Sequence, residues 1–294
     1  MNRLCRREFL KLAGACGAFC ITCPSGIAFA AGGESFFFIQ LSDTHIGFSD
    51  PLINPEYATT LEKAVAAINA MEPQPGFVAF TGDLTHTTDD PMERKRRLTS
   101  FKNIAKSLRV KDVRFLPGEH DAALDRGYAY QEILGPMHYA FTHKGVAFLA
   151  VDNVSDPSGS VGGAQREWMA RELKKLSTTD PIVVLTHRPL FDLAPDWDWA
   201  TRDGTQVLEL LEPYQNVTVL YGHIHQVHHK QTGHIGHHAA AGMMYPLPAP
   251  MSVPKKAPVP WDPAAPYKGL GYREVKGNAG EGAPVLMEIP MARV

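Results

Sequence analysis

Short apolar runs that each stop at a cluster of polar side chains constrain the fold of this sequence more than any other feature. Such runs, rich in β-branched and aromatic residues, predict buried strands. Residues 56–71, 164–176 and 205–211 instead repeat apolar side chains at helical spacing. Strands that alternate with helices predict an α/β architecture. The six runs are residues 36–41, 77–80, 113–116, 146–151, 182–185 and 217–221.

Side chains that can bind metals follow five of these runs. In α/β folds, ligands gather beyond the carboxyl ends of the strands, so these side chains are expected at one edge of the sheets. Burying so many carboxylates and imidazoles without partners is costly, and bound cations would offset that cost. Mixed nitrogen and oxygen donors suit Zn, Mn, Fe or Co better than Ca or Mg. The eight side chains are Asp43, His45, Asp83, Glu119, His120, His187, His223 and His225.

The order and spacing of these groups resemble the five sequence blocks of the calcineurin-like metallophosphoesterases. The blocks here are Asp43-x-His45, Gly82-Asp83, Gly118-x-His120-Asp121, His187 and Gly222-His223-x-His225, between about residues 36 and 226. The resemblance implies an α/β (α+β) sandwich of four layers, with two mixed β-sheets between helices and a metal site at the C-terminal ends of the strands. It also implies metal-dependent hydrolysis of phosphoric monoesters or diesters. The cyclic-nucleotide phosphodiesterase and purple acid phosphatase branches are the most similar.

The same resemblance implies a role for each side chain at a centre of two metal ions, drawn from Fe, Mn and Zn in some pairing. Asp83 would bridge the two ions. Asp43, His45 and His225 would hold the first ion, and His187 and His223 would hold the second. Two such cations would lower the pKa of a bridging water to give a hydroxide nucleophile, and would neutralise charge on the phosphoryl group.

Two residues of the third block would act on the substrate. The resemblance implies that His120 contacts the substrate phosphate and not the metals. An imidazole at that place can donate a proton to the leaving oxygen. Asp121 would accept a hydrogen bond from His120 and fix the orientation of its ring. We therefore assign His120 and Asp121 as the catalytic pair.

Glu119 departs from the family pattern, which usually has Asn at this position. Its carboxylate would still offer an oxygen ligand to the second ion, and it would add a negative charge to the centre. The substitution also leaves an alternative function open. The chain would then be a metal-binding or partner-binding module of the same fold, with its hydrolytic activity impaired by Glu119.

Several side chains beside these blocks have more than one interpretation. His86 stands three residues after Asp83, where a Tyr binds iron in the purple acid phosphatase branch, and it is either a further ligand or a polar loop residue. Arg188 is a candidate phosphate contact because its guanidinium matches oxyanion geometry. Five histidines nearer the C-terminus form either an accessory metal or phosphate site or a hairpin beside the centre. They are His228, His229, His234, His237 and His238.

The N-terminal residues predict export. Arg6 and Arg7 begin a twin-arginine pattern, a weakly apolar stretch follows, and residues 28–30 offer a small-x-small cleavage site. We expect a signal peptide over residues 1–30, recognised by the twin-arginine export machinery, and a periplasmic or otherwise exported protein. The alternative is an N-terminal membrane anchor, but the stretch contains too many polar and small residues for a good permanent span.

The expected mature chain is a single metallophosphoesterase domain, residues 31–294. Its last part, about residues 227–294, is rich in Pro and His and predicts a hairpin and irregular covering structure. All four cysteines precede residue 31, so this mature chain would have neither a disulfide nor a thiolate metal site.

Charge narrows the class of partner. The formal net charge is −2, and the basic run at residues 94–97 fits a solvated helix face. A chain without a broad basic surface is not expected to bind nucleic acid. We expect a small phosphorylated substrate instead.

Overall fold

Alternate side chains of the central strands pack into different cores, and this alternation sets the layers of the molecule. The computed structural model describes residues 19–22, 36–277 and 285–291. In β2 (Phe37–Leu41), Phe38 points into a core between two sheets, whereas Ile39 and Leu41 point into a core beneath helices. Strands buried on both faces are apolar throughout, which explains the continuous runs in the sequence.

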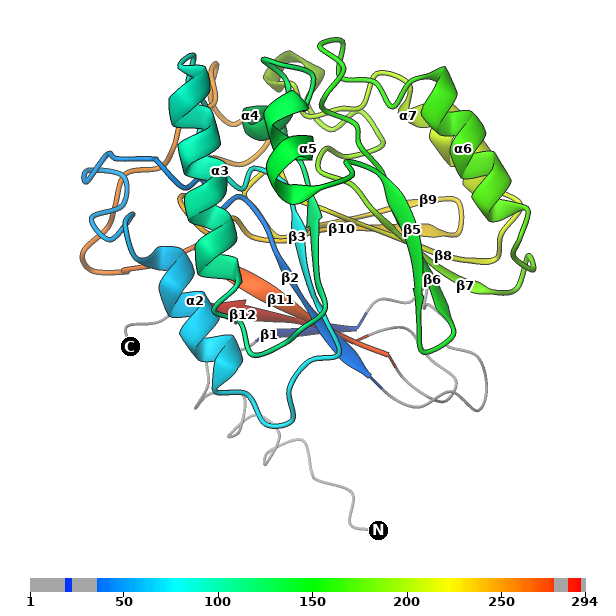
Figure 1. Ribbon diagram of the computed structural model, residues 1–294, viewed down its shortest axis with the longest axis horizontal. Helices are drawn as coiled ribbons and strands as arrows, with labels where there is room; N and C mark the ends of the chain where they lie inside the picture. The colour runs from blue at the N-terminus through cyan, green and yellow to red at the C-terminus, as the bar shows by residue number, and fades with distance from the viewer. Residues whose placement is uncertain (1–18, 23–35, 278–284, 292–294) are drawn as a thin grey trace.

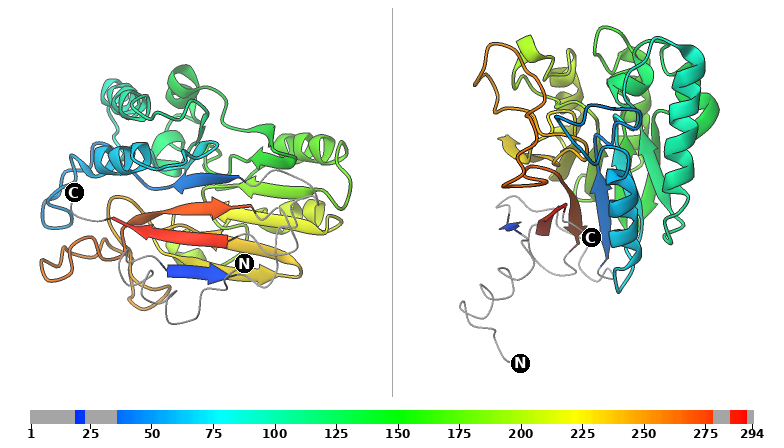
Figure 2. Two further views of the ribbon diagram at one scale, coloured as in Figure 1. Left: turned by 90° about the horizontal axis from the view of Figure 1, so that it is seen from below. Right: turned by 90° about the vertical axis from the view of Figure 1, so that its left-hand side faces the viewer.

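Two six-stranded sheets face each other across the middle core. The first has the spatial order β1 (Phe19–Thr22), β12 (Val285–Pro290), β11 (Gly271–Lys276), β2, β3 (Val78–Thr81) and β4 (Val113–Leu116). The second has the order β5 (Tyr139–His143), β6 (Val146–Ala150), β7 (Pro181–Leu185), β8 (Asn216–Tyr221), β10 (Ile235–Ala239) and β9 (His228–Thr232). Figure 2 shows β2, β11, β12 and β1 side by side.

Helices cover the outer faces of both sheets (Figure 1). The first sheet carries α2 (Thr60–Asn69) and α3 (Pro91–Ala105), with α5 (Tyr128–Leu134) packed against α3. The second carries α6 (Gly163–Leu173) and α7 (Gly204–Leu211). The short elements α4 (Glu119–Ala122) and η1 (Pro195–Trp197) lie in loops. The predicted sandwich of two mixed sheets flanked by helices is confirmed.

The direction of the strands positions the candidate site. β2, β3 and β4 run parallel to one another, and so do β6, β7, β8 and β10. The C-terminal ends of parallel strands meet at one edge of a sheet. The loops after β2, β3, β4, β7 and β8 are the ones that contain the expected metal-binding side chains.

The C-terminal part of the chain contributes more regular structure than the sequence predicts. The expected hairpin is present as β9 and β10, and an irregular segment follows it. Beyond that segment, β11 and β12 form an unexpected antiparallel pair that extends the first sheet. The region therefore completes both sheets in addition to covering the site.

Most of the expected signal peptide lies outside the described residues, as do the twin arginines and the cleavage site. Its one described segment, β1, pairs antiparallel with β12 at the edge of the first sheet. Across the described part of the chain, every helix is too short or too polar to cross a membrane.

Candidate metal centre

The turns after β2, β3 and β8 hold their metal-capable residues in a backbone conformation that is rare outside glycine. The φ angles are +57° at Asp43, +42° at His45, +48° at Asp83, +66° at His223 and +52° at His225. Left-handed residues of this kind cost about 1–3 kcal/mol each and cluster at functional sites. These five residues, half of the ten described non-glycine residues with positive φ, lie at the strand ends that the sequence blocks mark.

Two glycines of these blocks make room for the neighbouring side chains. A Cβ added at Gly82, whose φ is +94°, would collide with the ring of His187. A Cβ at Gly118 would collide with the carboxylate of Asp83. These glycines allow three strand-end loops to approach closely enough for their polar side chains to meet.

The first group of side chains that could hold a metal ion contains Asp43, His45, Asp83 and His225, whose ligand atoms lie within 4.8 Å of one another. All four residues are buried. Nε2 of His225 lies 3.2 Å from Oδ1 of Asp43 and 3.1 Å from Nε2 of His45. Nε2 of His45 lies 3.7 Å from Oδ2 of Asp83. The geometry therefore gathers two carboxylates and two imidazoles around one small volume.

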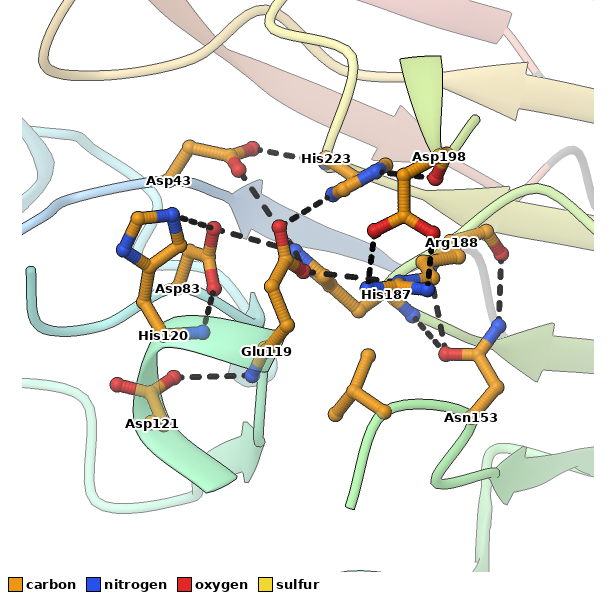
Figure 3. A network of polar contacts seen from close by, with 12 residues as sticks. Asp43, Asp83, Glu119, His120, Asp121, Asn153, His187, Arg188, Asp198 and His223 are labelled. Atoms are coloured by element: carbon orange, nitrogen blue, oxygen red, sulfur yellow. Dashed lines mark hydrogen bonds and ion pairs between the residues drawn. The ribbon is translucent and has the colours of Figure 1, made fainter. Parts of the chain in front are cut away.

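The second group contains Asp83, Glu119, His187 and His223 (Figure 3). Oε1 of Glu119 lies 2.9 Å from Nδ1 of His223, and Oε2 lies 3.0 Å from Nε2 of His187. The same Nε2 of His187 is 3.4 Å from Oδ2 of Asp83. Asp83 belongs to both groups, so a single carboxylate stands between them.

Backbone carbonyls select which nitrogen each imidazole presents. Nδ1 of His187 donates to the carbonyl of Thr81 at 2.7 Å, and Nδ1 of His225 donates to that of Tyr245 at 2.6 Å. Neutral rings with these tautomers present the lone pair of Nε2 to the centre. His223 is reversed: its Nε2 donates to the carbonyl of Asp198 at 2.8 Å, and Nδ1 faces Glu119. Hydrogen bonds of this kind accompany most metal-binding histidines.

The charges of the second group depend on one another. Burial acts to raise the pKa of Glu119, yet His223 and His187 hold it well below its usual value. Burial acts to lower the pKa of His187, yet Asp83 and Glu119 hold it well above its usual value. Unmetallated, the group would thus be a buried ion pair.

Several buried atoms of the two groups have no hydrogen-bond partner among the described residues outside the groups themselves: Oδ1 of Asp43, Oε2 of Glu119, Nε2 of His187 and Nδ1 of His223. Leaving such atoms unsatisfied is costly, and each points toward the other donors of its group. Cations that accept mixed nitrogen and oxygen ligands would satisfy all four atoms. The donor set therefore fits two metal ions.

His120 lies beside both groups, and a backbone amide orients it. The N–H of Thr87 donates to Nδ1 of His120 at 3.0 Å. This contact leaves any ring proton on Nε2, which lies 3.8 Å from Oδ2 of Asp83. A quarter of the His120 side chain is exposed, in contrast to the buried residues of the first group. His120 thus presents an N–H at the accessible side of the centre.

Asp121 does not make the contact expected of it. Among the described residues, its carboxylate accepts hydrogen bonds from the backbone N–H groups of Gly118, Leu84 and Thr85 and from the Thr85 hydroxyl. These bonds tie the loop after β4 to the loop after β3. Burial and the nearby Asp83 raise the pKa of Asp121 to about 7, although the four donors favour its ionised form. Asp121 therefore holds the two loops together. The ring of His120 is oriented instead by the Thr87 N–H, which donates to its Nδ1.

His86 sits at the edge of the first group. Its Nδ1 lies 3.4 Å from Nδ1 of His45, and its ring stacks on that of His120. Burial, with His120 and Arg97, lowers the pKa of His86 to about 4, which keeps the ring neutral. Arg97 donates to the carbonyls of His86 and Thr87 at 2.9 and 3.1 Å. Part of the basic run therefore supports the loop that orients His120.

The guanidinium of Arg188 forms an ion pair with the carboxylate of Asp198. Its Nη1 and Nη2 lie 2.8 and 2.6 Å from the two oxygens of Asp198. Its Nε lies 3.8 Å from Oε2 of Glu119. Asn153 fixes the backbone beneath it, because the Asn153 amide bonds to both the N–H and the carbonyl of Arg188 (Figure 3). Arg188 borders the second group, but its guanidinium is already paired.

The five additional histidines lie on or within the β9–β10 hairpin. Of the metal-capable groups in the described part of the chain, none includes one of them. Nδ1 of His228 contacts the Tyr221 hydroxyl at 2.9 Å, and Nδ1 of His229 contacts that of His238 at 2.7 Å. Nε2 of His234 donates to the Tyr214 carbonyl, and the ring of His237 packs edge-on against Phe191. The hairpin interpretation fits their placement.

Sequence patterns did not reveal Thr87, Asn153, Asp198 or Tyr245. Three of them act through backbone groups, which any residue type supplies. Asn153 follows the run at residues 146–151, and that position was the available signal.

Comparison with known proteins places this arrangement among characterised folds. A family model described as calcineurin-like phosphoesterase matches residues 38–227. A probable glycerophosphodiester phosphodiesterase of Arcobacter nitrofigilis is 27% identical over 204 residues, which are 64% of this chain and 71% of that protein. A 3′,5′-cyclic-nucleotide phosphodiesterase of Nostoc is 26% identical over 65% of this chain and 72% of the relative. The crystal structure of a dimetal phosphatase from Danio rerio shares the fold, with a TM-score of 0.58 at 14% identity over 86% of this chain and 99% of that one.

Proposed function

Because this chain belongs to the calcineurin-like phosphoesterase family, whose members are hydrolases, we propose that it hydrolyses phosphoric esters at a centre of two metal ions. Asp43, His45 and His225 would hold the first ion, and Glu119, His187 and His223 the second. Asp83 would contact both. Iron, manganese and zinc, in some pairing, suit these donors.

One observation supports this proposal above the others: two four-residue groups of buried donors share a single carboxylate, Asp83. Structural ion pairs seldom need seven donor side chains from five separate loops. Backbone carbonyls also fix the tautomers of His187, His223 and His225. Such hydrogen bonds accompany most metal-binding histidines, and a simple ion pair does not need them. Two relatives, a probable glycerophosphodiester phosphodiesterase and a cyclic-nucleotide phosphodiesterase, act on phosphoesters by name, which is consistent with a phosphoester substrate here.

When bound, two such ions would supply a hydroxide nucleophile and stabilise negative charge on the phosphoryl group. With Nδ1 accepting the Thr87 N–H, His120 keeps its ring proton on Nε2 at the accessible side of the centre and would donate a hydrogen bond from it to the phosphoryl group. A donor of this kind, placed where negative charge develops, is worth about 10²- to 10³-fold. Asp121 positions His120 indirectly, because it fixes the loop from which His120 extends.

A metal-binding module without hydrolytic activity is the second candidate, and the placement of Glu119 favours it. The carboxylate lies between His187 and His223 and is still 19% exposed, so it also borders the space that a substrate would enter. A carboxylate there would repel a phosphate if it did not bind a metal. The two candidates make opposite predictions for turnover.

Turnover of p-nitrophenyl phosphate and of bis-p-nitrophenyl phosphate by metal-loaded protein distinguishes them. The proposed function expects hydrolysis of at least one, abolished in Asp83→Asn and retained in Asp156→Asn, a control that removes an exposed carboxylate outside both groups. Two bound ions without turnover of either compound would favour the binding module and overturn the proposed hydrolysis.

We also propose that the protein is exported through the twin-arginine pathway. The sequence of residues 6–11 and the small residues at 28 and 30 support this proposal. The pathway typically moves folded proteins, which suits an enzyme that takes up its metal ions before export.

A further inference from the structure

Lys256 differs from the residues around it in the covering segment. Residues 251–255 are exposed, whereas Lys256 is half-buried. Its Nζ lies 5.9 Å from the ring centroid of Trp199, which is fully buried. Lys255, one position earlier, is exposed and has no such contact among the described residues.

Trp199 connects Lys256 to the second group of the metal centre. Asp198, next to Trp199, accepts a hydrogen bond from His223 through its carbonyl and binds Arg188 through its carboxylate. The Asp198 side chain is 59% exposed, and Arg188, its partner, borders Glu119. We call this solvent-exposed edge of the second group, formed by Asp198 and Arg188, the mouth of the centre. Lys256 therefore approaches the mouth from the side of Glu119, His223 and Arg188.

The charged groups that act on Lys256 belong to the metal centre or border it. Burial lowers the pKa of its ammonium, while the carboxylates of Glu119, Asp198 and Asp83 act to raise it. Nevertheless, within residues 36–277 and 285–291 no ion pair shorter than 4.0 Å joins Lys256 to a carboxylate. Its three N–H donors are thus available at the mouth, whereas the guanidinium of Arg188 is paired with Asp198.

Glu119 lowers the net positive charge of the centre, so a further cation would help it to bind an anionic substrate. Asp43, Asp83 and Glu119 contribute three negative charges, so two divalent ions leave one net positive charge before hydroxide binds and none once it has bound. A phosphomonoester carries two negative charges near neutral pH, and a phosphodiester carries one. An additional ammonium at the mouth would offset part of the greater negative charge of the monoester and meet its extra anionic oxygen.

We propose that Lys256 binds a phosphate oxygen of the substrate and makes this centre prefer phosphomonoester dianions over phosphodiesters. The inference rests on the proposed function, since it selects a substrate class for the same site. The covering segment then contributes a specificity residue to the centre. In a diester the corresponding oxygen is esterified, so Lys256 would lose an anionic partner.

Lys256→Gln tests this assignment, with Lys255→Gln as the matched control. A charge-assisted hydrogen bond is worth roughly 10-fold or more in binding. For Lys256→Gln we expect about a 10-fold rise in KM for p-nitrophenyl phosphate with kcat little changed. We also expect a similar rise in the Kd of inorganic phosphate, measured by calorimetry on metal-loaded protein. KM for bis-p-nitrophenyl phosphate should change by less than about 2-fold, and Lys255→Gln should match the unmodified protein throughout.

Equal effects of Lys256→Gln on both substrates would overturn the preference, and an unchanged Kd for phosphate would overturn the contact. Failure of the preference and failure of the proposed function give different results. If the unmodified protein hydrolysed neither compound, the proposed function would fail, and the preference with it. The phosphate titration would then still decide whether Lys256 binds an oxyanion at this mouth.

Discussion

Replacing Glu119 by Ala is expected to remove the second metal ion while the first is kept. Glu119 contacts both imidazoles of the second group, at 2.9 and 3.0 Å, and belongs to that group alone. The first group keeps all four of its donors in the variant. The loss of the carboxylate should therefore affect one ion selectively.

The structure suggests the size of the effect. Changing an outer partner of a metal ligand typically costs about 10- to 100-fold in affinity. Glu119 is a proposed ligand and supplies one of only two carboxylates in its group. We therefore expect the second ion to bind more than about 100-fold more weakly, which corresponds to about 2.7 kcal/mol. Glu119→Asn would instead restore a neutral oxygen donor, keep both ions and shift the acidic limb of the pH–rate profile to lower pH, because bound water should be more acidic beside fewer negative ligands.

Calorimetric titration of metal-free protein with Zn²⁺ or Mn²⁺ measures both affinities. The unmodified protein should take up two ions per chain, and Glu119→Ala should show one step unchanged and one weakened. Glu132→Ala is the control, since Glu132 pairs with Lys95 on the surface and is 51% exposed. Two ions bound with unchanged affinity, or both weakened equally, would refute the assignment of Glu119 to the second ion.

Three further predictions concern Asp83, His120 and the two N-terminal arginines. Asp83→Asn should lose at least one ion and all turnover, because both groups share this carboxylate; two ions and a near-normal rate in elemental and kinetic assays would contradict its bridging role. His120→Ala should retain both ions and lose about 10²-fold or more in kcat, whereas loss of metal would make His120 a ligand. Replacing Arg6 and Arg7 by Lys should leave unprocessed precursor in the cytoplasm, and normal export on immunoblots of cell fractions would exclude the twin-arginine pathway.

The parts of the fold that could be predicted are mainly strands buried on both faces, although β4, which contains Arg114, is only partly buried. The run at residues 113–116 coincides with β4, and the other five runs overlap strands to within one or two residues. Strands buried on both faces are continuously apolar, so the sequence marks them directly.

The unexpected strands are held by polar contacts that periodicity does not reveal. Arg273 in β11 is fully buried, yet it is a charged residue in a six-residue strand. Its guanidinium reaches the carbonyl of His238 at 3.1 Å, and its Nε pairs with Glu288 of β12 at 2.5 Å. Because its partners lie 35 and 15 residues away, the local sequence predicts an exposed loop at this position.

The candidate site divides in a similar way. Side chains at the ends of parallel strands could be predicted to meet, since the topology brings those ends together. The orientation of His120 could not, because the amide of Thr87 has no sequence pattern of its own. The expectation for Asp121 failed because adjacency in sequence does not ensure contact: its carboxylate turns toward Gly118, Leu84 and Thr85 instead.

A crystal structure of the metal-loaded protein, with anomalous scattering to locate the ions, would show whether the centre holds two metal ions. We expect two peaks about 3.5–4 Å apart, one within each group of donors, with Asp83 in contact with both. A carboxylate oxygen of Glu119 should lie about 2.0–2.2 Å from the second ion. A single peak, or peaks away from Asp83, would contradict the two-metal centre.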